Sequence, residues 1–390
     1  MSKLRFEDPG FFTTIQDAGR TGYQQYGMPV AGAMDSESYL LGQRLVGNVP
    51  YNAARINAKA PATNTATGLV QGANQPSANP TSAITTATTT KALGLSALEC
   101  TYTPPTFTVV EGPCVVAFTG ANMAPTVNGA PVPLNTPIRL HEGDTVSGAP
   151  ADPATAGLRL YIAVRGGFAV PTVNNSASTH TKAGIGGLEG RRLQAGDELT
   201  IGDSRRPPNL DLGGLPALAV SETYQVPYQK PLLLRVVLGP QADRFTEEAA
   251  TILQRSSYTI TPSSDRMGYR LEGEPLPHSN GADIISDGAV FGSIQVPHNG
   301  QPIILMADRQ TTGGYTKIAT VITPDLPRLA QAGPGKPITF TVISVAEAHR
   351  IYKDYIDDLA RTVVPTPVTG TIKDVTIDGI HFTVAVQKIK

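Results

Sequence analysis

Residues 302–322 read PIILMADRQTTGGYTKIATVI. The apolar runs at the two ends of this stretch, residues 302–306 and 318–322, predict two strands. The Gly313-Gly314 pair between them predicts a tight hairpin turn, because glycine readily adopts the positive φ that such turns need. A turn does not need the Asp, Arg, Gln, Thr, Tyr and Lys side chains that also gather here. This surplus of polar groups indicates a candidate functional site.

The composition indicates many short strands joined by turns. The chain has 390 residues, including 39 Gly and 33 Pro, and only 16% of its residues are charged. Such a mix favours strands and turns over long helices, and the length suffices for two or three domains. The formal net charge of −1 offers no basic field for nucleic acid or for an anionic membrane surface.

We expect a soluble, cytoplasmic protein. No apolar segment follows the charged residues near the N-terminus, and no apolar run approaches the ~20 residues of a membrane span. The two cysteines, Cys100 and Cys114, are too few for a disulfide framework and are expected to be buried thiols. The six histidines show no ligand spacing, so no metal site is predicted.

Recurring turn signals between strand-like runs suggest one barrel-like unit at about 98–203, and further strand-like runs indicate a second unit at about 232–345. Residues 51–96 have few large apolar side chains and no clear period, so they are expected to be a flexible insertion. Helices are expected after Asp35 or Ser36, over 241–254 and over 346–359. The expected segments are an N-terminal motif segment at 1–50, the Ala/Thr-rich insertion at 51–96, a first barrel at 97–206, a linker at 207–231, a second barrel at 232–345, and a C-terminal helix and hairpin at 346–390.

A second polar stretch lies near the N-terminus. Residues 13–23 read TTIQDAGRTGY and lead to GAMDS at residues 32–36. Other uncommon strings follow in order: RGGF at 165–168, GGLEGR at 186–191, DRMGYRL at 265–271, SDG at 286–288 and QVP at 295–297. Together with the opening stretch they resemble the biotin-dependent carboxyltransferase, or allophanate hydrolase subunit 2, family, and within it the branch of the 5-oxoprolinase C subunits. The resemblance runs from about residue 4 to about residue 350.

The resemblance implies a mainly β fold, in which two cyclophilin-like β-barrel units are joined by a few short helices. It implies a component of an ATP-dependent 5-oxoprolinase complex that converts 5-oxoproline to glutamate. The hydrolase would be active only with two partner proteins: a homologous, cyclophilin-like protein of the B type and a protein of the A type. The block at 51–96 departs from the family, which crosses this region in a few residues.

Two other functions stay open. One is the carboxyltransferase component of a urea-carboxylase-like, biotin-dependent system, and the other is a non-catalytic regulatory binding protein. ATP would be used through the complex, because the chain has no G-x-x-x-x-G-K-[ST] phosphate loop. Biotin is not expected on this chain, because no Met-Lys-Met attachment motif occurs in it.

Under the 5-oxoprolinase interpretation, the site needs cations near phosphoryl oxygens and donors near a developing oxyanion. The catalytic candidates are Arg309, Gln310, Thr311 and Lys317. The candidates for substrate binding are Gln16, Asp17, Arg20, Tyr23, Arg266, Gln295 and Thr312.

Structural explanations compete with each of these assignments. The polar groups of residues 308–317 could simply bond one another in a turn. Asp17 and Arg20 could form a local salt bridge. His298, which comes shortly before the opening stretch, is either an acid–base group or a surface turn residue.

Overall fold

The computed structural model describes residues 2–48, 96–152, 156–202, 218–220, 232–365, 371–377 and 380–386. Side chains are described up to residue 362, apart from those of residues 218–220. The expected insertion at 51–96 lies outside the described residues except for Ser96, and so does most of the expected linker at 207–231.

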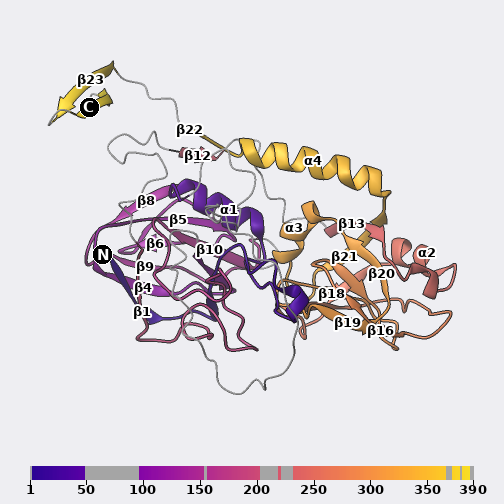
Figure 1. Ribbon diagram of the computed structural model, residues 1–390. Helices are drawn as coiled ribbons and strands as arrows, with labels where there is room; N and C mark the ends of the chain where they lie inside the picture. The colour runs from indigo at the N-terminus through magenta and orange to yellow at the C-terminus, as the bar shows by residue number, and fades with distance from the viewer. Residues whose placement is uncertain are drawn as a thin grey trace, which may run out of the picture.

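The strands of the N-terminal unit form two sheets (Figure 1). The apolar side chains of the two sheets share one core. The six-stranded sheet has the order β11 (Glu198–Thr200), β1 (Lys3–Asp8), β4 (Thr106–Glu111), β9 (Thr145–Ser147), β6 (Thr126–Val127), β7 (Ala130–Pro131). The five-stranded sheet has the order β2 (Phe12–Gln16), β3 (Ala97–Thr101), β10 (Arg159–Val164), β5 (Cys114–Gly120), β8 (Pro137–Leu140). Cys100 and Cys114 are buried free thiols, as expected.

Helix α1 (Ser36–Leu45) packs against β5 and β10 of the five-stranded sheet (Figure 1). Asp35 caps the helix, because its carboxylate accepts hydrogen bonds from the backbone N–H groups of Glu37 and Ser38. Gly47, with φ of 75°, lies just beyond the C-terminal end. The helix predicted after Asp35 is therefore confirmed.

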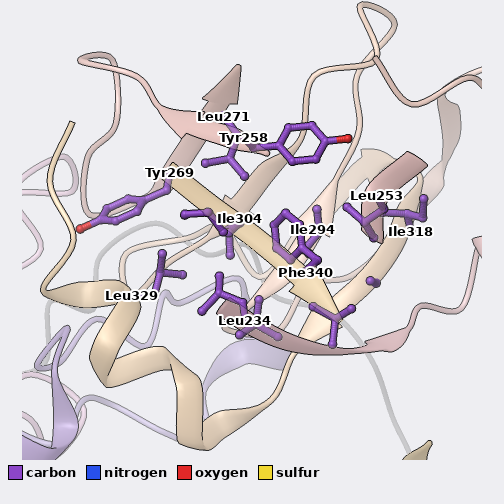
Figure 2. Packing of buried hydrophobic residues seen from close by; sticks show 14 of the residues in the cluster. Leu234, Leu253, Tyr258, Tyr269, Leu271, Ile294, Ile304, Ile318, Leu329 and Phe340 are labelled. Atoms are coloured by element: carbon purple, nitrogen blue, oxygen red, sulfur yellow. The ribbon is translucent and has the colours of Figure 1, made fainter. Parts of the chain in front are cut away.

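The second unit is a closed barrel. Its strand order is β13 (Leu232–Leu238), β20 (Lys317–Val321), β17 (Ser293–Gln295), β18 (Ile303–Leu305), β15 (Gly268–Glu272), β14 (Tyr258–Ile260), β21 (Pro337–Val342). Figure 2 shows the apolar side chains that fill it, among them Leu234, Ile304 and Phe340, each no more than 2% exposed. The prediction of a mainly β fold with few helices is confirmed.

Few helices accompany the strands. The 3₁₀ helices are η1 (Gln24–Tyr26), η2 (Ala242–Arg244) and η3 (Thr323–Asp325), and the α-helices after α1 are α2 (Ala249–Arg255), α3 (Leu326–Ala330) and α4 (Val345–Arg361). Helix α4 extends from the barrel back over α1 (Figure 1). The remaining strands are the pair β12 (Leu218–Val220) and β22 (Val363–Pro365), the pair β16 (Asp283–Gly288) and β19 (Thr312–Tyr315), and the expected C-terminal hairpin of β23 (Thr371–Ile377) and β24 (Ile380–Val386).

Two local predictions were wrong. The helix expected over 241–254 begins only at Ala249, because Phe245 has extended backbone and bridges to His278. Strands β18 and β20 do not form a hairpin, since each pairs with β17, which lies between them. Gly313 and Gly314 lie in β19 and are not among the residues with positive φ.

The two units meet around the buried carboxylate of Glu99, on β3 of the first unit. This carboxylate accepts hydrogen bonds from the Tyr161 hydroxyl (2.6 Å) and the Met34 N–H (2.8 Å). It also forms an ion pair with Arg266 of the barrel, and Arg159 Nε lies 3.7 Å from it. Burial alone would raise the pKa of Glu99, but Arg266 and Arg159 outweigh burial and hold this pKa below its ordinary value.

Gln331, directly after α3, links the barrel to both α1 and β10 of the first unit. Its side-chain oxygen accepts hydrogen bonds from the backbone N–H groups of Leu158 (3.0 Å) and Arg159 (2.9 Å). Its amide nitrogen donates to Asp35 Oδ2 (2.7 Å) and to the Arg159 carbonyl (3.0 Å). One side chain of the barrel therefore completes the hydrogen bonding at the start of β10 and at the N-cap of α1.

The Gln331→Ala variant should be less stable than the parent chain by about 2–6 kcal/mol. Two buried backbone N–H groups would lose their acceptor, and each such loss costs about 1–3 kcal/mol. Urea unfolding followed by circular dichroism measures the difference. The exposed Gln194 offers a matched control, because Gln194→Ala should stay within about 0.5 kcal/mol of the parent. Equal stability of the two variants would contradict the role given to Gln331.

Candidate functional site

A row of three polar residues and one isoleucine crosses the outer face of the barrel. Arg270 of β15 pairs with Ile303 of β18, Ile303 pairs with Gln295 of β17, and Gln295 pairs with Lys317 of β20, next to a register shift. Directly paired residues of antiparallel strands point to the same face of a sheet. Their neighbours along the strands, Tyr269, Ile304, Ile294 and Ile318, fill the barrel core instead. The row is therefore directed away from the core.

A groove of about 830 Å³ lies over the first three residues of this row, and Lys317 is not among its lining residues. Arg270, Ile303 and Gln295 line it together with Gln310 and Tyr315. Gln295 and Gln310 were both predicted as site residues, and the fold brings them to the same groove although they come from different segments.

Gln295 is the buried donor of the groove. Its side chain is 3% exposed, and its amide nitrogen has no hydrogen-bond partner. Gly313 of β19 lies directly against it, because a Cβ added at Gly313 would come within 2.2 Å of that nitrogen. A buried amide without a partner is costly to the stability of the fold.

Lys317 is the buried cation of the row. It is 2% exposed, and its Nζ lies 3.0 Å from Oδ2 of Asp287, whose side chain is 50% exposed. Gln241 joins the pair: its amide nitrogen donates to the same Asp287 oxygen (3.1 Å), and its oxygen accepts from the Lys317 backbone N–H (3.2 Å). Lys317 is thus held by groups that reach it from β16 and from the segment after β13.

Arg309 holds the chain between β18 and β19 in place. Its guanidinium donates to the carbonyls of Ala289 (3.2 Å) and Met306 (3.3 Å) and lies 5.7 Å from the centre of the Phe291 ring. Burial lowers the pKa of Arg309 to about 10, so the side chain remains protonated at neutral pH. Beyond it, Thr311 is half-buried and Thr312 is exposed.

The N-terminal candidates lie in the first unit. Gln16 is fully buried and donates to Thr14 Oγ1 and the Thr179 carbonyl. Asp17 accepts from the N–H groups of Gly19 (2.8 Å) and Ala177 (2.6 Å).

Arg20 and Tyr23 also contact the segment that contains residues 173–178. Arg20 donates to the carbonyls of Val173 and Ser178, and Asn175 donates to the Tyr23 hydroxyl (3.1 Å). Asp17 and Arg20 do not form the direct salt bridge that was one alternative, since the described ion pairs include none between them. Gln16, Asp17, Arg20 and Tyr23 are not among the residues that line the barrel groove.

Arg266 belongs to the contact between the two units. It makes a two-pronged ion pair with Asp308 (3.0 and 2.9 Å), pairs with Glu99 and donates to the Gly32 carbonyl (2.7 Å). Burial alone would lower the pKa of Arg266, but Asp308 and Glu99 raise it above its ordinary value. Four hydrogen bonds join its guanidinium to protein groups, and its side chain also lines a cavity between the units.

A second cavity, of about 580 Å³, lies between the units next to the groove. The two cavities share Lys182, Asp265 and Met267 in their walls, and Lys182 Nζ lies 3.1 Å from Asp265 Oδ2. Within the described part of the chain, no group of three His, Cys, Asp or Glu side chains could hold a metal ion. None of the described helices is long and apolar enough to cross a membrane.

Sequence reasoning did not select Arg270, Asp287 or Gln241. Arg270 and Asp287 lie within the DRMGYRL and SDG strings, from which only Arg266 was selected as a site residue. The strand alternation around the buried Tyr269 could have placed Arg270 on the outer face. No local sequence pattern could have identified Gln241, because its hydrogen bond to Asp287 joins residues that only the folded barrel brings together.

Comparisons with known proteins agree with the resemblance. A family model, the carboxyltransferase domain, subdomain A and B, matches residues 83–342. The C subunit of the 5-oxoprolinase of Escherichia coli (strain K12) is 34% identical over 360 residues, which are 92% of this chain and 97% of that protein. Urea amidolyase of Saccharomyces cerevisiae is 28% identical over 90% of this chain, but the match spans only 17% of that protein.

The fold agrees as well. The crystal structure of the urea carboxylase of Kluyveromyces lactis is 25% identical, with a TM-score of 0.69, over 98% of this chain and 32% of that one. The two-unit arrangement, the matched strings and the whole-length likeness all point the same way. The chain belongs to the carboxyltransferase domain family, subdomain A and B.

Proposed function

We propose that this chain is a component of an ATP-dependent 5-oxoprolinase complex, which converts 5-oxoproline to glutamate. The observation that carries the proposal is the likeness to the 5-oxoprolinase C subunit over 97% of that relative. The match to urea amidolyase, by contrast, spans a small part of a much longer protein.

The chemistry of the groove supports this reaction class. A lactam carbonyl is a poor electrophile, so its hydrolysis benefits from activation by ATP and from donors at the oxygen that becomes negatively charged. Gln295 has an amide nitrogen without a partner, and Gln310 lines the same groove. We assign these two side chains to the carbonyl oxygen, and Lys317 to the stabilisation of negative charge nearby.

The other candidates have supporting parts in this proposal. Arg309 keeps the segment before β19 in position through two backbone carbonyls. Thr311 and Thr312 follow Gln310 directly and would support its position, although they do not line the groove. Arg266 and the N-terminal residues Gln16, Asp17, Arg20 and Tyr23 would fix the surrounding segments through the contacts described above.

The proposed complex contains a homologous, cyclophilin-like protein of the B type and a protein of the A type. Because this sequence has no phosphate loop of the G-x-x-x-x-G-K-[ST] type, we assign ATP binding to the complex rather than to this chain alone. Biotin would not be attached to this chain.

The second candidate function is a carboxyltransferase component of a urea-carboxylase-like system. The likeness to urea amidolyase and to the urea carboxylase structure favours it. The groove would then hold a carboxylated cofactor and a urea-like acceptor, whose amide groups suit the same Gln side chains.

The purified chain alone should show almost no turnover of 5-oxoproline with ATP, whereas the chain with its two partner proteins should show robust turnover. Release of glutamate and of phosphate measures the reaction, and parallel assays with urea and a biotin carboxylase component test the second candidate. The proposal would be overturned if the single chain turned over 5-oxoproline, or if the reconstituted system turned over urea but not 5-oxoproline.

The Gly313→Ala variant should lose about 10- to 100-fold in turnover by the complex while it keeps its fold. The added Cβ would displace the amide nitrogen of Gln295, and removal of one such donor typically costs this much or more. Gly314→Ala is the matched control, because a Cβ there meets its nearest atoms at 3.7 and 3.9 Å. Equal activity of the two variants would exclude Gln295 from the reaction.

A further inference from the structure

Arg270 is an exposed arginine that lines the groove and has no ion pair among the described contacts. The other cations of the site are held by protein groups: Arg309 by hydrogen bonds to the carbonyls of Ala289 and Met306, and the rest by ion pairs. Lys317 is paired with Asp287, Arg266 with Asp308 and Glu99, and Lys182 with Asp265. Arg270 is therefore the guanidinium whose planar fork is available to an anion in the groove.

A second unused donor lies close to Arg270. Gln295 is two strands away on the same face, with Ile303 between them. Neighbouring strands are about 4.8 Å apart, so the two backbone positions are separated by roughly 10 Å, which an arginine side chain can largely span. Gln295 is buried and its amide nitrogen is unpartnered. A ligand that lies over Ile303 would meet the Arg270 cation at one end and the Gln295 side chain at the other.

The charges around the groove favour a small anion of low charge. Asp265 neutralises Lys182, at a distance of 3.1 Å. Glu272 lies two residues after Arg270 on the same strand and also lines the groove. Its carboxylate would repel a polyanion such as a nucleotide triphosphate more strongly than a single carboxylate.

We propose that Arg270 binds the carboxylate of a small amide-bearing acid, while Gln295 donates to the amide carbonyl of the same molecule. Arg270 thereby determines specificity: a neutral amide of the same size lacks the group that it recognises. This inference rests on the proposed function for the identity of the ligand, which is then 5-oxoproline, a lactam with one carboxylate.

The test compares Arg270→Gln with the parent chain in the reconstituted complex. The KM for 5-oxoproline should rise about 10- to 100-fold, as expected for the loss of a charge-assisted hydrogen bond, while the KM for ATP stays the same. The neutral lactam 2-pyrrolidone should be a poor substrate of the parent and should be equally poor for the variant. Arg139→Gln is the matched control, because Arg139 is also an exposed strand arginine but lies on β8 of the first unit.

A binding experiment separates this inference from the proposed function. In the isolated chain, the Nε–H resonance of Arg270, assigned by its loss in Arg270→Gln, should shift and saturate with acetate. If the complex turns over 5-oxoproline but this resonance does not respond and the KM is unchanged, the inference is wrong and the function stands. If only inorganic phosphate saturates the resonance and the KM for ATP rises, the anion is a phosphoryl group and the assignment to the carboxylate is overturned.

Discussion

The ion pair between Glu99 and Arg266 is the interaction on which the arrangement of the two units depends. The two side chains come from different units, and both are nearly inaccessible to water. A buried charge is costly to remove from water, and the attraction within the pair offsets this cost only when further hydrogen bonds satisfy both groups. Tyr161, Met34 and Asp308 supply these hydrogen bonds.

This buried pair also reaches the site. Asp308, which holds the other edge of the Arg266 guanidinium, lies at the start of the segment that leads through Arg309 to β19. The network therefore fixes one end of the segment that carries Gln310, while the pairing of β19 with β16 places Gly313. A contact between the units thus holds a residue two positions before Gln310, which lines the groove, even though Glu99 does not line it.

The sequence predicted features that depend on local chemistry. The cap at Asp35, the strands of both units and the C-terminal helix follow from periodicity, capping and β-branched residues, and all are present. Gln295 and Gln310 are predicted from their hydrogen-bond donors, and both line the groove.

The features that the sequence did not predict depend on distant pairing. Gly313 and Gly314 are predicted to form a turn, yet they lie in strand β19. This strand forms because it pairs with β16, which lies earlier in the chain, before β17 and β18. Arg266 is predicted to contact substrate, although its partners Glu99 and Gly32 come from the other unit. The sequence does not single out Arg270, because nothing local distinguishes an arginine that lacks a carboxylate partner from one that has one.

The central claim, that the Glu99–Arg266 pair couples the two units, is tested most directly by a double-mutant cycle. The free energy of unfolding would be measured in urea for the parent chain, Glu99→Gln, Arg266→Met and the double variant. We expect each single variant to lose about 3–5 kcal/mol, and the double variant to lose at least about 2 kcal/mol less than the sum of the two. Additivity within about 0.5 kcal/mol would contradict the account, because it would show that the two side chains act independently.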